Sequence, residues 1–148
     1  MLSTVARFVA LLTTGAVPPP APAGHDSCYR YAPVAVELTG RLIQRTLPGP
    51  PNYQSIARGD RPQVVDLLIL DAAICTLADD HRDSPNSDAF QGQDTIQVRR
   101  AETTWRDVRR LTGQRVTVTG TLAEWALGKD HTPVLIDPTE VRAAPASR

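Results

Sequence analysis

The chain has 148 residues and carries 16 lysines and arginines against 16 aspartates and glutamates, with 13 prolines, 9 glycines and two cysteines. This length supports one small domain. The net charge of zero argues against a general nucleic-acid binder, which would carry a basic excess, and two cysteines are too few for a four-cysteine zinc site or a dense disulfide scaffold.

The N-terminal residues have the pattern of an export signal. A single charge at Arg7 precedes an apolar stretch from Phe8 to Val17, which is too short to span a bilayer. Ala21-Pro22-Ala23 follows with the small residues of a signal-peptidase site. We therefore predict a signal peptide over residues 1–23 and a periplasmic or secreted protein with no membrane span after cleavage. The alternative is a loose amphipathic terminus of a cytoplasmic protein.

The two cysteines lie far apart in the sequence, Cys28 in a predicted linker over residues 24–33 and Cys75 in the run Ala73-Ile74-Cys75. In an oxidising compartment each is the only partner available to the other within the chain. We expect a disulfide between them. The alternative is two free thiols, with Cys75 as a small core residue.

The first half of the predicted domain reads as three strands. Alternation over Val34–Ile43 places Val34, Val36, Leu38 and Leu42 on one face. Gly40 on the same face is typical of a bulge or a strong coil. A second strand is predicted over Val64–Leu70 with Val65, Leu67 and Ile69 facing inward, and a short third strand over Ile96–Val98.

The period changes between Thr103 and Gly113, where Trp105, Val108 and Leu111 recur at three-residue steps. This spacing predicts a two-turn helix with these three residues on its apolar face. Thr104 is expected to cap its start with Asp107 reaching back, and Gly113 to end it.

Two more strands complete the domain. Val116, Val118, Gly120 and Leu122 alternate with threonines, and a last strand runs from Val134 to Ile136, with Val141 as its furthest end. Three strands, a short helix and two strands are typical of a small five-stranded, partly open, OB-like Greek-key barrel with the helix between strands 3 and 4. The fold class is thus mainly β, with the barrel over residues 34–142 and a disordered tail over 143–148.

Several segments carry a family resemblance. Residues 48–60 read PGPPNYQSIARGD, and a strand ending LILDAAIC, then IQV, then GQRVTVTGTLAEWALGKDHTPVLI follow in the same order. Over roughly residues 34–137 they resemble the bacterial exported family catalogued as domain of unknown function 4431. The resemblance implies an exported, single-domain, β-rich protein and brings no activity with it. Family members carry a run of histidines before the threonine of the final loop, and this chain keeps only His131 there.

The Pro48–Asp60 loop is the first candidate site, because the connection between the first two strands of such barrels borders the binding face. Pro50 and Pro51 stiffen it, while Gly49 and Gly59 permit backbone angles that other residues avoid. We expect it to present Asn52, Tyr53, Ser55 and Asp60 to a ligand. The alternative is structural: Tyr53 and Ile56 pack beneath the barrel, while Asn52 and Asp60 bond to nearby backbone amides.

The second candidate site is the loop Lys129–Thr132, which offers His131 and Thr132 as ligand-binding residues. Asp130 and His131 are also weak candidates for metal ligands, too few for a site unless other loops converge on them. No cofactor is predicted.

Charge is segregated along the chain. Seven aspartates and one arginine lie within residues 66–94, and six arginines lie within residues 99–115. The acids Asp79, Asp80, Asp83 and Asp88 with Asn86 could supply a calcium site, but their spacing lacks the pattern and the central glycine of an EF-hand and favours a solvated loop. The arginines fit a solvated helix surface or a site for an anionic polymer, with Trp105 as the only aromatic platform.

The predicted function is a non-catalytic binding module of the cell envelope, a monomer that holds an envelope protein or an oligosaccharide through the two candidate loops. Inhibition of an envelope or foreign hydrolase is one form of the protein-binding hypothesis. The alternative is a metal-dependent hydrolase that uses His131 and the aspartates of the 79–88 loop. Catalysis has little support, because Ser55 lacks a nucleophile elbow and His25, His81 and His131 have no defined partner. The neutral charge argues against a nucleic-acid partner.

Overall fold

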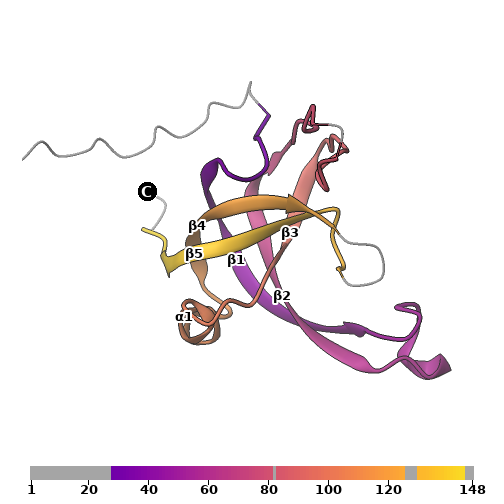
Figure 1. Cartoon of the computed structure of the whole chain (residues 1–148). Coiled ribbons are helices and arrows are strands. Elements are labelled where there is room, and N and C mark those ends of the chain that lie inside the picture. Colours follow the sequence, from indigo (N-terminus) through magenta and orange to yellow (C-terminus); the bar gives the residue numbers. More distant parts are fainter. Residues whose placement is uncertain (1–27, 82, 126–129, 146–148) are drawn as a thin grey trace, which may run out of the picture.

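The structure is a computed structural model, and it describes residues 28–81, 83–125 and 130–145. The predicted signal peptide lies outside these residues. Figure 1 shows the elements in chain order: β1 (Ala35–Pro48), the 3-10 helix η1 (Ile56–Arg58), β2 (Pro62–Ile74), β3 (Gln93–Val98), α1 (Trp105–Leu111), β4 (Arg115–Glu124) and β5 (Val134–Ala143). The mainly β class, the five strands of the described chain and the helix between the third and fourth are confirmed. Each of these five strands extends beyond its predicted range at one or both ends.

The five strands form one mixed sheet. β1 pairs antiparallel with both β2 and β4, β2 pairs antiparallel with β3, and β4 pairs antiparallel with β5. A short parallel pairing between β3 and β5 joins the two halves. The order β1-β2-β3-β5-β4 therefore returns to β1, and the sheet closes on itself.

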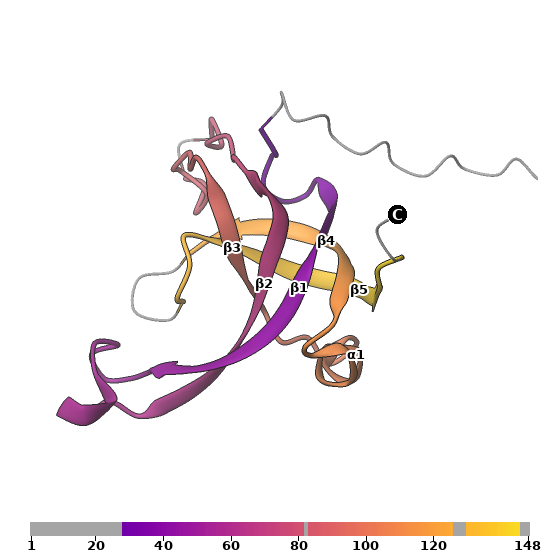
Figure 2. The same cartoon turned by 180° about the vertical axis from the view of Figure 1, so that it is seen from behind.

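β1 changes neighbours along its length, and Gly40 lies at the change. Residues 35–41 pair with β4, and residues 40–48 pair with β2. A side chain at Gly40 would collide with the carbonyl of Ile69 on β2, so glycine is needed here for close approach of two backbones. Beyond the last pair of β2 with β3, at Asp66, β1 and β2 continue as a two-stranded arm, which carries residues 49–61 at its tip (Figures 1 and 2).

The core lies inside the closed sheet. Val36, Leu38 and Leu42 of β1 are buried, as are Val116, Val118 and Leu122 of β4, so alternation identified the inner faces of these two strands. Val34 precedes β1 and is exposed. Val141 is buried within β5, which extends to Ala143 and so includes the first residue of the predicted tail.

The predicted inner face of β2 is wrong. Leu68 and Leu70 belong to the core cluster, whereas Ile69 is 37% exposed. Val65 and Leu67 are buried but lie outside that cluster. Every residue from 65 to 68 is buried, so the run is apolar on both faces, and periodicity cannot fix the phase of such a strand.

The helix differs from its prediction at its start. Val108 and Leu111 are buried, but Trp105 is 38% exposed. Thr104 precedes the helix without a side-chain capping bond, and Asp107 pairs with Arg110 instead of reaching back. The predicted end is confirmed: Gly113 has φ +88° and donates its N–H to the carbonyl of Leu42 at 2.7 Å.

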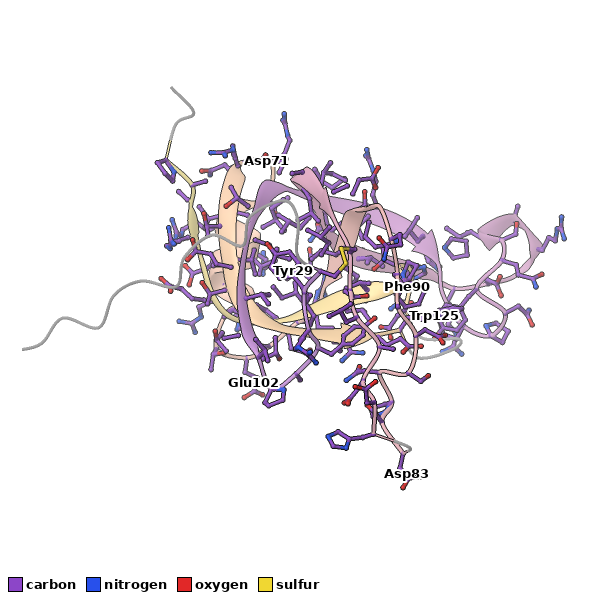
Figure 3. The ribbon with its side chains drawn as sticks, turned by 90° about the horizontal axis from the view of Figure 1, so that it is seen from above. Tyr29, Asp71, Asp83, Phe90, Glu102 and Trp125 are labelled. Carbon is purple, nitrogen blue, oxygen red and sulfur yellow. A yellow bond between two sulfur atoms is a disulfide. The ribbon has the colours of Figure 1, made fainter. Side chains whose placement is uncertain are left out.

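The predicted disulfide between Cys28 and Cys75 is confirmed, and Figure 3 shows it in yellow between the labelled Tyr29 and Phe90. Next to it, the N–H of Tyr29 donates to the carbonyl of Cys75 at 2.8 Å. A disulfide indicates an oxidising, non-cytoplasmic compartment. Among the described residues, no helix has the length and hydropathy needed to cross a membrane.

Candidate functional site

The loop at the tip of the arm, residues 49–61, is organised around Asp60. This residue is 4% exposed, and its carboxylate accepts hydrogen bonds from the backbone N–H groups of Asn52, Gln54 and Ser55 at 2.9, 2.8 and 2.7 Å. The bond from Ser55, with those from Gln54 and Asn52, lowers the pKa of Asp60 below its ordinary value. The structure therefore shows the structural alternative for Asp60, in which its carboxylate bonds to nearby backbone amides. Asp60 is thus a residue that positions the loop.

The same network presents Tyr53. Its N–H donates to the carbonyl of Gly49 at 2.9 Å, and its φ of +57° is rare for a residue other than glycine. Backbone conformations of this kind cluster at sites where a side chain must be aimed. The Tyr53 side chain is half-buried, and Ile56, predicted in the alternative to pack beneath the sheet, is 43% exposed. Asn52 is also exposed, while Ser55 is half-buried.

The second predicted loop reaches Tyr53. The rings of Tyr53 and His131 lie 5.9 Å apart between centroids with an interplanar angle of 52°, which is within the range of favourable aromatic pairs. His131 Nε2 also lies 3.4 Å from Oε1 of Gln63 on β2. The structure thus brings the two sequence-predicted loops together through one residue from each.

Gln97 of β3 holds the second loop in place. Its Oε1 accepts the N–H of His131 at 2.9 Å, and its own N–H donates to Oγ1 of Thr132 at 2.8 Å. Thr132 is buried, and its hydroxyl donates to the carbonyl of Val134 at 2.7 Å. Of the two ligand-binding candidates here, His131 is therefore placed at the surface, and Thr132 supports the loop.

A hollow of about 660 Å³ lies beside these residues, over the outer side of β2 and β3. We call it the Gln63 hollow, and its lining includes Gln63, Val64, Asp66, Gln97, Arg99 and Asp130. Arg99 pairs with Asp130 at 3.4 Å and with Asp137 at 3.2 Å. Sequence reasoning missed Gln63, Gln97 and Arg99. The signal that could have found one of them is a glutamine between two apolar residues of a short strand, at Gln97.

A second hollow of about 600 Å³ lies between the arm and α1. We call it the Trp105 hollow, and its lining includes Gln44, Val64, Asp66, Arg100, Trp105 and Arg109. Val64, Asp66 and Arg100 line both hollows. Asp66 accepts hydrogen bonds from Arg100 Nε at 2.9 Å and from Gln44 Nε2 at 2.8 Å, so this ion pair stands between the two hollows.

The acidic loop after Cys75 forms a hydrogen-bonded unit of its own. Asp79 accepts from the hydroxyl of Ser84 at 2.9 Å, and this bond lowers the Asp79 pKa. Asn86 Oδ1 accepts the N–H of Glu124 at 2.9 Å. Figure 3 shows Asp83 at the outer tip of the loop. Two of the candidate calcium ligands, Asp79 and Asn86, thus form hydrogen bonds that stabilise the loop.

The described residues do not assemble the metal site that the sequence left open. Within residues 28–81, 83–125 and 130–145, no group of three histidine, cysteine, aspartate or glutamate side chains is placed to hold a metal ion. His131 contacts Tyr53 and Gln63. Asp60 binds the amide of Ser55, so its carboxylate organises the loop.

No protein-family model, curated protein or solved structure matches this chain. The chemistry of the two hollows and their loops therefore carries the functional conclusion.

Proposed function

We propose that the protein is an exported, non-catalytic binding module with an OB-like Greek-key barrel, whose binding face is the Gln63 hollow and the two loops above it. The strand order β1-β2-β3-β5-β4 with a helix between β3 and β4 supports the barrel assignment. The disulfide supports export, as does the N-terminal sequence. We also propose that the chain belongs to the exported family of unknown function that it resembles at residues 48–60.

The observation that carries the proposal is the contact between Tyr53 and His131. The two residues come from different loops, and each is held by a separate network, one centred on Asp60 and the other on Gln97. Two hydrogen-bonded loops that meet beside a hollow are typical of a site whose shape is formed before the ligand arrives. A mere surface contact would not require both loops to be fixed from below.

We propose an oligosaccharide as the ligand. The face combines a half-buried tyrosine ring and an imidazole with the amide of Gln63. Aromatic rings pack against the apolar faces of sugars, and planar amides exchange hydrogen bonds with hydroxyl groups. The charged residues of the hollow include the pair Arg99 and Asp130, so the face has no strong excess of either sign.

A protein segment is the second candidate ligand, and the arm favours it. Residues Pro62 to Val65 of β2 pair with β1 on one side, while the pairing with β3 begins at Asp66. In the described part of the chain this stretch therefore has no strand partner on its other edge, beside the Gln63 hollow, where the carbonyl of Val64 accepts from Arg100 Nη2 at 3.5 Å. An extended peptide could add to it by strand pairing.

A glycan array of cell-envelope oligosaccharides, followed by calorimetric titration of the best binder, tests the proposal. Tyr53→Ala combined with His131→Ala should abolish binding with little change in melting temperature. His81→Ala is the matched control, because His81 lies in the acidic loop with its side chain 90% exposed. Undiminished binding by the double variant would contradict the proposal, and a collapse of stability would show that the two residues are structural.

A further inference from the structure

The six arginines between residues 99 and 115 fall into two groups. Four of them pair with carboxylates: Arg99 with Asp130 and Asp137, Arg100 with Asp66, Arg110 with Asp107, and Arg115 with Asp71. Among the ion pairs of the described residues, none involves Arg106 or Arg109. These two guanidinium groups are exposed and have no carboxylate partner within the described structure.

Both guanidinium groups lie against the ring of Trp105 instead. The Cζ atoms of Arg106 and Arg109 are 5.6 and 5.5 Å from its centroid, within the range of cation–π attraction. The tryptophan itself is 38% exposed. The short helix thus presents an aromatic ring flanked by two cations, a combination of residues that is enriched where proteins bind partners.

The Trp105 hollow adds an apolar floor to this cluster. Val108, Val64 and Ala101 line it together with Trp105 and Arg109. Val64 is 46% exposed, which is high for a valine in a strand. A ligand in this hollow can bury apolar surface on Val64 and Trp105 while an anionic group reaches Arg109.

We propose that the Trp105 hollow, with Arg106 and Arg109, is a second binding site that takes an acidic segment of a partner protein. A glutamate or aspartate side chain would bind the unpaired guanidinium groups by charge-assisted hydrogen bonds. An apolar side chain next to it in the segment would contact Val64 and Trp105. The site shares Val64, Asp66 and Arg100 with the Gln63 hollow but includes neither Tyr53 nor His131, so variants of those two residues test the oligosaccharide proposal separately.

The charge distribution favours an acidic protein segment over a nucleic acid or an anionic membrane. Glu102 lines the same hollow, and Asp66 there is neutralised by Arg100. The surface thus offers two unpaired cations beside one further carboxylate. Closely spaced phosphates or lipid head groups would meet Glu102 as well, whereas isolated carboxylates on a peptide can avoid it. The zero net charge of the chain points the same way.

Trp105 provides the readout for a test, because the chain has two tryptophans, Trp105 and Trp125. In the full chain carrying Trp125→Phe, fluorescence reports on Trp105 alone. The probe is a short synthetic peptide in which glutamates flank leucines, and its control is the same peptide with glutamine in place of glutamate. We expect saturable quenching or a spectral shift with the acidic peptide, weakened by added salt, and binding at least about tenfold weaker for the glutamine peptide.

Paired variants assign the binding to the two arginines. Arg106→Gln with Arg109→Gln should weaken the acidic peptide by about tenfold or more. Arg110→Gln with Arg142→Gln removes the same charge from arginines that already have carboxylate partners, and it should leave the affinity within about twofold. Circular dichroism melts of both double variants check that each remains folded. Tyr53→Ala with His131→Ala should leave peptide binding unchanged.

Four results would overturn the proposal: absence of saturable peptide binding, equal binding of the glutamine peptide, equal losses in both arginine double variants, or tighter arginine-dependent binding to another polyanion. For the last comparison the probes are oligodeoxythymidine and vesicles of phosphatidylcholine with phosphatidylglycerol. Either one binding more tightly than the peptide through Arg106 and Arg109 would replace the protein segment by that class of ligand.

Discussion

The two long connections on either side of β2 are both built around polar hydrogen bonds, but they are attached to the molecule differently. Residues 49–61 close on themselves through Asp60 at the tip of the arm. Residues 75–92 are joined to the core, by the Cys28–Cys75 disulfide and by Tyr31, which is 3% exposed. The first loop can therefore change without affecting the core, and the second cannot.

This difference separates binding from stability. A disturbance at the core-anchored connection should lower the global free energy of unfolding, because buried contacts and a covalent link are lost with it. A disturbance in the tip loop should change local order and ligand binding, because its hydrogen bonds end within the loop. The variants that follow are ordered by their expected effect on the free energy of unfolding.

Removal of the disulfide should have the largest effect. Cys28→Ser with Cys75→Ser opens a loop whose ends are 47 residues apart in sequence, and the chain-entropy model gives a loss of about 4 kcal/mol. Urea denaturation of the variant and of the chemically reduced wild-type chain measures it. The two should agree. A loss below about 1 kcal/mol in both would contradict the view that this connection stabilises the core.

Tyr31→Phe should have the next largest effect. The Tyr31 hydroxyl lies 3.0 Å from Oγ1 of Thr76 and donates to the carbonyl of Asp88 at 3.0 Å. Thr76 Oγ1 retains its bond from the N–H of Phe90 in the variant. The expected cost is about 1 kcal/mol, the net contribution of a buried hydrogen bond, read from urea midpoints. Tyr29→Phe is the control, because no hydrogen bond of the Tyr29 hydroxyl occurs among the described residues.

How much the sequence predicts also differs between these regions. Alternation identified the inner faces of β1 and β4, since each has one polar face. It failed for β2, where residues 65–68 are buried on both faces, and for Trp105, whose helix is too short to define a wide apolar stripe. Which face of β2 is inward, and whether Trp105 is buried, depends on neighbouring elements that are in place only in the folded chain.

The site shows the same limit. Tyr53 and His131 were both predicted from their loops, because residue types in proline-rich and glycine-rich connections are informative by themselves. Gln63 and Gln97 were not, because their roles depend on β2 and β3 lying side by side and on the parallel pairing of β3 with β5. The sequence left open whether Asp60 contacts a ligand or supports the loop. Only the folded positions of the Asn52, Gln54 and Ser55 amides decide between the two roles.

Asp60→Asn should have a smaller global effect and a clear local one. The side-chain amide that replaces the carboxylate keeps its shape but has one acceptor oxygen, so its NH2 group faces N–H donors and cannot accept from Asn52, Gln54 and Ser55 as both carboxylate oxygens do. Hydrogen exchange at these three amides should become faster, while exchange in β4 stays unchanged. Binding to the oligosaccharide should weaken, because Tyr53 is no longer held.

The pH dependence of the tip loop has a definite sign. The pKa of Asp60 is lowered in the folded chain, so the ionised carboxylate contributes stability above the ordinary aspartate pKa of about 3.9. That contribution is lost as the pH falls through the lower folded-state value. The protection of the Ser55 amide, which is the intrinsic exchange rate relative to its observed rate at the same pH, should therefore decrease below about pH 4 in the wild type, with a flatter profile in Asp60→Asn. Equal profiles in both proteins would show that Asp60 does not hold the loop.

Tyr53→Ala should have the smallest effect on stability and the largest on binding. The Tyr53 ring is half-buried and contacts His131 from the neighbouring loop, and aromatic pairs of this kind contribute about 0.5–1.5 kcal/mol. Alanine keeps a Cβ, so the left-handed backbone at φ +57° stays unfavourable in Tyr53→Ala. Tyr53→Gly separates the two contributions: it removes the ring and relieves the backbone fully, so it should be at least as stable as Tyr53→Ala while binding equally poorly. A loss of more than about 1.5 kcal/mol in Tyr53→Gly relative to the wild type would show that the ring contributes to the core, and the distinction between the two connections would then fail.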